Sequence, residues 1–417
     1  MEHSLDLTYH WAGFSALVVF VIAYAFVMAE EFTHLRKSKP VVLAAGLIWG
    51  MIAIAYSNTP HYEMVEHEIR HSFLEYTELA FFLLVAMTYI NALEERNVFN
   101  SLKSWLIKNQ FSYRQLFWIT GVLAFFLSPL ADNLTTALVL CAVVVAVGSS
   151  SPKFVGLACV NIVVAANAGG AFSPFGDITT LMVWQAGQLD FLQFFALVIP
   201  SVVNYIIPAS IMHFFVSDHK PDVAETSVTI KYGGKTIILL GLLTIVTAVS
   251  FHNFLHLPPV FGMMTGLAYL QLYSFYIKIS VKDIEEQKYD FFENVARVEW
   301  DTLLFFFGVI LSVGGLGFIG YLEYVSEFMY TDLGATTANV LVGILSAIVD
   351  NIPVMFAVLT MEPAMPDSQW LLVTLTAGVG GSMLSIGSAA GVALMGQSRG
   401  MYTCLLYTSD AADDVEC

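Results

Sequence analysis

The sequence predicts an all-α polytopic membrane protein built from two inverted-topology repeats, each with a re-entrant hairpin and a broken transmembrane helix. Of 417 residues, 57% are hydrophobic and only 12% are charged, whereas soluble domains carry about 25% charged residues. Many apolar segments reach the ~20 residues that a transmembrane helix needs. Short polar motifs interrupt other apolar segments, and these motifs recur in the second half of the chain.

Seven segments are long and apolar enough to span a membrane without interruption. The first of them has no basic residues before it, so we expect a retained helix and not a cleaved signal peptide. The seven are Leu7–Met28, Pro40–Ser57, Ser72–Leu93, Phe191–Val216, Thr236–Phe254, Pro258–Ile277 and Thr302–Tyr321.

Four further apolar segments are interrupted by Gly, Pro, Asn and Asp. Gln115–Gly148 breaks around Asp132 into two pieces, Gln115–Leu127 and Thr135–Gly148, and Ala335–Thr360 breaks around Asp350. We interpret both as re-entrant hairpins. The other two, Phe154–Gly187 and Gln369–Met395, are interpreted as spans made of two half-helices. Non-helical backbone at membrane depth is tolerated only where protein buries it or where it lines a cavity, so all four breaks indicate a site.

The basic residues orient the spans, because cytoplasmic loops are enriched in Lys and Arg. The N-terminus is predicted outside the cell and residues 36–39 inside. Residues 58–71 are predicted as an outer loop, residues 97–113 as an interfacial helix, and the acidic stretch after Tyr321 as an outer loop with Glu323, Glu327 and Asp332. This topology places every basic residue except Arg70 inside.

The two halves carry matching motifs. The stretch that begins at Ser128 and contains Asp132 and Asn133 recurs 218 positions later, with Ser346, Asp350 and Asn351. Because the predicted halves have opposite orientation, the site is expected at the repeat interface near the membrane midplane.

The repeat also predicts the domain organisation. Residues 1–216 form the first repeat, residues 217–235 a cytoplasmic linker and residues 236–403 the second repeat. No partner of Phe191–Val216 follows the second repeat, so we expect that its last helix is missing and that residues 404–417 are an atypical, non-native tail.

Ionisable groups at membrane depth are costly and are interpreted as functional by default. The carboxylates of Asp132, Asp177 and Asp350 can each hold an alkali cation, Na⁺ or Li⁺, or alternatively a proton. The structural alternative is that each one only caps a half-helix. Three carboxylates at matched breaks favour the functional interpretation.

Neutral oxygen atoms are expected to complete the cation and proton site, although each could instead serve only the local backbone. These candidates are Asn133, Asn167, Asn351, Thr179, Thr180, Ser128, Ser346, Ser385 and Ser388. Three further carboxylates are candidates for a proton pathway: Glu78, Glu299 and Asp301.

Other features argue against other functions. The net charge of −17 opposes nucleic-acid binding, which requires basic surfaces. No cofactor is predicted. Cys141 and Cys159 lie in apolar segments and are expected to pack there. His61, His67 and His71 alternate with Glu63, Glu66 and Glu68 in the predicted outer loop; a solvated loop is expected, with metal binding and pH sensing as alternatives.

Four motifs in order resemble the NhaD-type Na⁺/H⁺ antiporters of the ion transporter superfamily, over about residues 8–403. They are SPLADNLTTALVL, NAGGAFSPFGDITTLMVWQAG, SAIVDNIPVMFAVL and GGSMLSIGSAAGVALMGQSRG.

This resemblance implies a secondary antiporter, not an enzyme, that exchanges Na⁺ or Li⁺ for H⁺ in the bacterial inner membrane or the plastid envelope. It implies a homodimer, and it points to the candidate residues above, with Glu78 and Glu299 at acidic positions of the family. The first alternative is a Na⁺-coupled anion or dicarboxylate carrier of the same superfamily, which three acidic residues at the breaks disfavour. A remoter alternative is an intramembrane aspartyl protease.

Overall fold

The computed structural model describes residues 5–148, 151–220, 228–280 and 289–384, together with Ser388, Ala390, Gly391 and Leu394. These residues form helices and connecting turns, with no strand among them. The predicted tail, residues 404–417, lies outside the described residues. Nine of the described helices are long and apolar enough to cross a membrane, so the chain is a multi-pass integral membrane protein.

The first half contains ten α-helices and one 3₁₀ helix. They are α1 Trp11–Met28, α2 Glu30–Thr33, α3 Ser38–Tyr56, α4 Tyr62–Glu95, α5 Val98–Lys108, α6 Tyr113–Ala131, α7 Asn133–Gly148, α8 Pro152–Gly170, α9 Ile178–Gln185, η1 Phe191–Leu197 and α10 Val198–His213.

The described part of the second half is helical as well. Its described elements are α11 Gly234–Leu255, α12 Pro259–Ser280, α13 Phe291–Ala296, α14 Trp300–Phe318, α15 Tyr321–Ser326, the π-helix η3 Glu327–Asp332, α16 Ala335–Ile348, α17 Asn351–Thr360 and α18 Asp367–Gly380.

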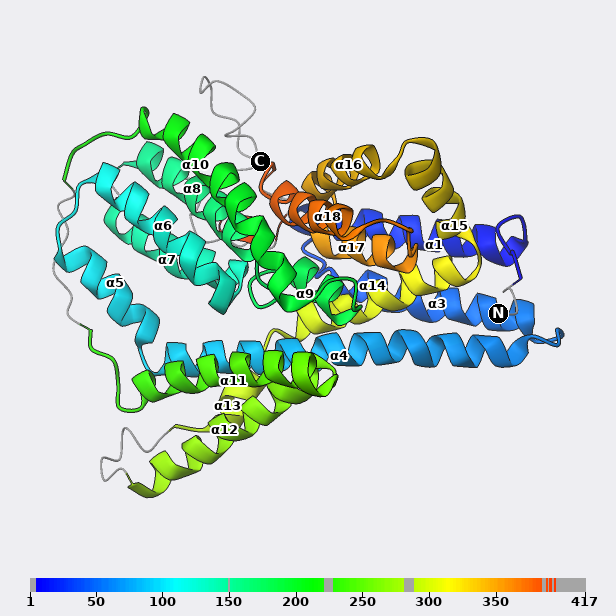
Figure 1. Ribbon diagram of the computed structural model, residues 1–417, viewed down its shortest axis with the longest axis horizontal. Helices are drawn as coiled ribbons and strands as arrows, with labels where there is room; N and C mark the ends of the chain where they lie inside the picture. The colour runs from blue at the N-terminus through cyan, green and yellow to red at the C-terminus, as the bar shows by residue number, and fades with distance from the viewer. Residues whose placement is uncertain are drawn as a thin grey trace.

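Two groups of helices lie side by side (Figure 1). Helices α6, α7, α8 and α10 pack together in one group, α16, α17 and α18 pack with α14 in the other, and α18 contacts α8. The long helix α4 runs beneath both groups, with α11 and α12 packed against it. The ends of the half-helices therefore meet in the middle of the molecule.

Matching contacts occur in the two groups. Ser128 Oγ donates to the Ala166 carbonyl at 2.7 Å, and Ser346 Oγ donates to the Ala377 carbonyl at 2.7 Å. Each serine lies 218 positions from its counterpart and each carbonyl 211 positions from its own.

Two glycines match in the same way. A Cβ at Gly169 would collide with the Phe125 carbonyl oxygen, and a Cβ at Gly380 would collide with the Gly343 carbonyl oxygen. These pairs are separated by the same two intervals as the serine contacts, 218 for the acceptors and 211 for the glycines. Only glycine allows the backbones to approach so closely.

The predicted outer loop at residues 58–71 is mostly helical, so that prediction was wrong. Helix α4 already begins at Tyr62. Arg70 donates to Glu66 at 2.6 Å, and His71 lies 3.9 Å from Glu75. Such i, i+4 pairs stabilise a polar helix without any apolar stripe, and the apolar periodicity therefore did not reveal this part of α4.

The hairpin pieces were also predicted too short. Helix α6 continues through Pro129 to Ala131, so it is long enough to cross a membrane by itself. Ser173 Oγ donates to the Pro129 carbonyl at 2.8 Å, which is one of the last four carbonyls of α6 and has no partner within the helix.

The acidic stretch after Tyr321 was predicted as a loop and is helical. Glu323 lies in α15, and Glu327 and Asp332 lie in η3. The short helices α2 and α13 were not predicted. Each has six residues or fewer, too few for periodicity to reveal.

Candidate functional site

A cavity of about 120 Å³ lies where the breaks of the helices meet. Residues of the α6–α7 turn, the α8–α9 break, the α16–α17 break, α4 and α14 line it. Ser388 reaches it as well. The ionisable residues that line it are four acids and two bases: Asp132, Asp177, Glu299, Asp350, Lys37 and Arg297.

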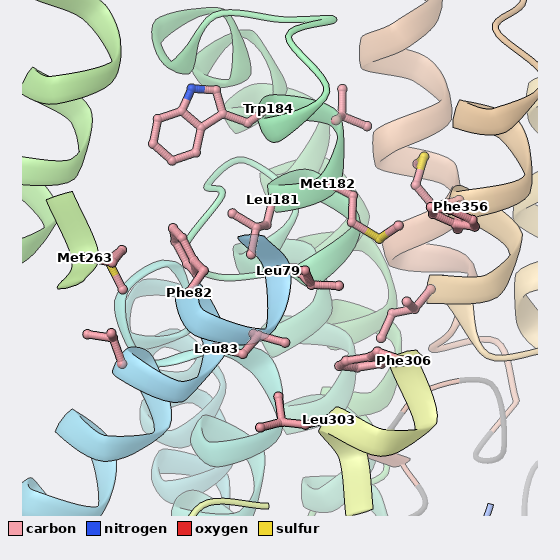
Figure 2. Packing of buried hydrophobic residues seen from close by; sticks show 14 of the residues in the cluster. Leu79, Phe82, Leu83, Leu181, Met182, Trp184, Met263, Leu303, Phe306 and Phe356 are labelled. Carbon is pink, nitrogen blue, oxygen red and sulfur yellow. The ribbon is translucent and has the colours of Figure 1, made fainter. Parts of the chain in front are cut away.

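Asp177 is the N-cap of half-helix α9. Its Oδ1 accepts from the Thr179 backbone N–H at 2.9 Å and from Thr179 Oγ1 at 2.8 Å. Apolar side chains fix this half-helix: Figure 2 shows Leu181 and Met182 among side chains of α4, α14 and α17. Asp177 is only 3% exposed, so the fold holds a carboxylate in its interior.

The asparagines of the two Asp-Asn pairs both turn toward Asp177. Asn133 Nδ2 donates to Asp177 Oδ2 at 3.3 Å, and Asn351 Nδ2 donates to Asp177 Oδ1 at 3.5 Å. The two breaks, far apart in sequence, thus meet at one carboxylate. In the described part of the chain, Asp177 makes no ion pair with a basic side chain.

Asn167 extends this network from α8. Its Oδ1 accepts from Asn133 Nδ2 at 3.2 Å. Its own Nδ2 is buried without a hydrogen-bond partner among the described residues. Buried polar atoms are normally satisfied, and an exception needs an explanation such as an ion or a ligand.

Asp132 has different partners. It accepts from the Thr135 backbone N–H at 2.8 Å and from Thr135 Oγ1 at 2.9 Å. Its own backbone has φ +55° and ψ 162°, a region that residues other than glycine rarely adopt. The strained turn between α6 and α7 places Asp132 against the cavity. Asp132 also accepts hydrogen bonds from the first turn of α7, as expected if it caps that half-helix.

Asp350 forms an ion pair with Lys37, whose Nζ lies 3.2 Å from Asp350 Oδ2. From the sequence, Lys37 was expected only in a cytoplasmic loop. A residue 313 positions away gives no local signal of this contact. Each of the three aspartates therefore has a different environment.

The hydroxyl candidates mostly bond the backbone in this structure. Ser128 and Ser346 make the matched bonds described above, and Thr180 Oγ1 donates to the Ala171 carbonyl at 3.1 Å. Thr179 bonds Asp177 directly. Ser385 lies outside the described residues.

The three candidates for a proton pathway lie in three places. Glu299 lines the central cavity. Asp301 accepts a hydrogen bond from Ser38 Oγ beside it. Glu78 lines a separate cavity, together with Glu75 and Glu362. The structure therefore does not bring Glu78 to the aspartates.

The arrangement suits a small cation. Carboxylate, amide and hydroxyl oxygens are the ligands that hard cations prefer, and burial of a charged carboxylate is costly unless hydrogen bonds, a cation or a proton compensate the charge. Asp177 accepts hydrogen bonds from Thr179, Asn133 and Asn351 but has no basic partner among the described residues, so its charge is available to a cation or a proton.

Comparisons with known proteins identify the family of the chain. Residues 11–378 match the model of a family described as citrate transporter. The chain is 55% identical to a Na⁺/H⁺ antiporter NhaD of Vibrio cholerae serotype O1, over 96% of this chain and 89% of that protein. It is 54% identical to a Na⁺/H⁺ antiporter NhaD of Alkalimonas amylolytica, over 96% of this chain and 87% of that protein.

A plant relative is more distant. Sodium/proton antiporter 1 of Arabidopsis thaliana is 33% identical, over 92% of this chain and 67% of that protein. On the bacterial and plant likenesses together, the chain belongs to the NhaD-type antiporter family, within the larger group that the citrate-transporter model describes.

Proposed function

We propose that this protein is a secondary antiporter that exchanges Na⁺ or Li⁺ for H⁺ across the membrane. The observation that carries the proposal is the buried Asp177 carboxylate. It accepts hydrogen bonds from Asn133 and Asn351, and it has no basic partner among the described residues. The relatives' names as Na⁺/H⁺ antiporters support it and agree with a transporter, not an enzyme.

Exchange follows from competition for one group. A protonated Asp177 is neutral and has no charge to hold Na⁺, and a Na⁺-bound Asp177 has no place for a proton. Asp132 lies against the same cavity and can bind a cation or a proton in turn, and Glu299 offers a carboxylate at the cavity for proton entry. The oxygens of Asn133, Asn167 and Asn351 complete the coordination; Asn133 and Asn351 first turn their amide groups over, because each points its Nδ2 at Asp177 in this structure.

The repeat architecture is part of the proposal. The paired serine bonds and the paired glycine contacts support two inverted repeats, with α6–α7 and α16–α17 as re-entrant hairpins. Location in the bacterial inner membrane, an N-terminus outside the cell and a homodimer are proposed with it, from the positions of the basic residues and from the family.

The competing function is transport of an organic anion, which the citrate description of the family model raises. Four carboxylates against two basic side chains at the cavity disfavour a tricarboxylate, and Arg297 is already paired with Glu94 at 3.3 Å. Everted vesicles energised with a pH gradient distinguish the two functions. We expect Na⁺ or Li⁺ to dissipate the gradient and citrate to have no effect. Dissipation by citrate with none by Na⁺ would refute the proposal.

A further inference from the structure

Among the described residues, Lys37 is the one basic side chain that forms an ion pair with an aspartate of the central cavity. It lies just before α3, in the turn after α2. Its Nζ is 3.2 Å from Asp350 Oδ2, and the two side chains are only 20% and 15% exposed. The contact is therefore largely withdrawn from bulk solvent.

The surroundings hold the lysine in this position. Its Nζ also lies 4.4 Å from the centre of the Phe305 ring on α14, a distance at which a cation is attracted to the ring face. The Lys37 backbone N–H donates to Glu30 Oε1 at 3.4 Å, and the next residue, Ser38, bonds Asp301. The end of the turn that carries Lys37 is therefore fixed against α2 and α14.

We propose that the Lys37 ammonium group is a tethered cation that competes with the transported cation for Asp350 and so sets the apparent affinity for Na⁺. This inference rests on the proposed function. An ammonium group and Na⁺ carry the same charge and require the same carboxylate oxygens. A Na⁺ ion can use Asp350 only when the Lys37 ammonium group moves away from that carboxylate.

The same competition explains the asymmetry of the three aspartates. Asp177 accepts hydrogen bonds from Thr179, Asn133 and Asn351, and Asp132 accepts from Thr135. Neither forms an ion pair with a basic side chain among the described residues. Of the three aspartates, only Asp350 has its negative charge balanced by a basic side chain, Lys37, in the described structure. Sodium therefore enters first at Asp177, and recruitment of Asp350 requires Lys37 to leave.

A purely structural salt bridge makes a different prediction. If Lys37 only anchors the α16–α17 break against α3 and α14, its removal will weaken the fold or slow transport and will not tighten Na⁺ binding. If it competes, its removal will tighten Na⁺ binding. The direction of the affinity change therefore decides between the two roles.

The test uses Lys37→Met, which keeps the length and apolar stem of the side chain, and Lys37→Gln as a milder neutral change. Lys39→Met is the matched control, because Lys39 lies in the same segment and is exposed. Binding of ²²Na⁺ to purified full-length protein at fixed pH and ionic strength gives the dissociation constant, and exchange in everted vesicles gives the half-saturating Na⁺ concentration.

We expect both neutral variants to lower both constants by about 5-fold, the ratio that corresponds to an ion pair of ~1 kcal/mol. Lys37→Arg and Lys39→Met should stay near the wild-type values. Unchanged or weakened Na⁺ binding in a folded neutral variant would overturn the inference. If the wild type exchanges no Na⁺ for H⁺, the proposed function fails by itself, and the binding data still report whether Lys37 competes.

Discussion

Replacement of Asp177 by asparagine removes the charge on which the proposed site depends and leaves its shape almost unchanged. The wild-type carboxylate accepts from Thr179 on Oδ1 and from Asn133 on Oδ2. An asparagine that keeps its oxygen toward Thr179 presents its amide group to Asn133, where two donors then face each other. The fold loses one hydrogen bond, and the site loses its negative charge.

The two effects have different magnitudes. One unsatisfied buried donor costs ~1–3 kcal/mol, and removal of an uncompensated buried charge offsets part of that cost. The stability without sodium should therefore change little. Sodium binding, in contrast, stabilises the wild type by about 2.7 kcal/mol at a concentration 100 times its dissociation constant, and this whole increment should vanish in Asp177→Asn.

The assay is thermal unfolding of the purified protein in detergent, with NaCl replaced stepwise by choline chloride at constant ionic strength. The unfolding temperature of the wild type should rise with Na⁺ and that of Asp177→Asn should not. Asp332→Asn is the control, because Asp332 is exposed and lies outside the cavity. An undiminished sodium-dependent rise in Asp177→Asn would refute the assignment of Asp177 as the cation site.

Further predictions concern the matched contacts. Gly169→Ala and Gly380→Ala should each reduce the yield of folded protein extracted from membranes, because the new Cβ would collide with a backbone carbonyl. Size-exclusion chromatography measures this yield, and Gly50→Ala, which has open space around it, is the control and should not reduce it. Normal yields of both Gly169→Ala and Gly380→Ala would contradict the packing. Ser128→Ala and Ser346→Ala should each lower the free energy of unfolding by ~1 kcal/mol, the worth of one hydrogen bond, in parallel denaturation experiments. A loss in only one of the two serine variants would argue against equivalent roles.

The fold class could be predicted from the sequence because lipid imposes strong and local requirements. Runs of apolar residues gave the spans, and Gly, Pro and Asp gave the positions of the breaks near Asp132, Asp177 and Asp350. The predicted helix boundaries were wrong where pairs of charged side chains stabilise a polar helix, as in the first turns of α4. They were also wrong where a helix continues through a proline, as in α6.

The residues proposed for the site remain a prediction, and their contacts could not be read from the sequence. Asn133 and Asn351 were expected in the site, but no spacing indicated that both would donate to Asp177. The Lys37–Asp350 pair depends on how α3 packs against α14, a tertiary arrangement that no spacing encodes. Tertiary contacts between distant segments decide which carboxylate remains without a basic partner.

Sodium-driven proton movement tests the central claim most directly. The measurement is the change in internal pH of proteoliposomes that contain only the purified wild-type chain, after addition of Na⁺, Li⁺, K⁺ or citrate, beside proteoliposomes with Asp177→Asn. The account predicts proton movement with Na⁺ and Li⁺ for the wild type and none for the variant. Equal proton movement in the two preparations, or movement driven by citrate alone, would contradict it.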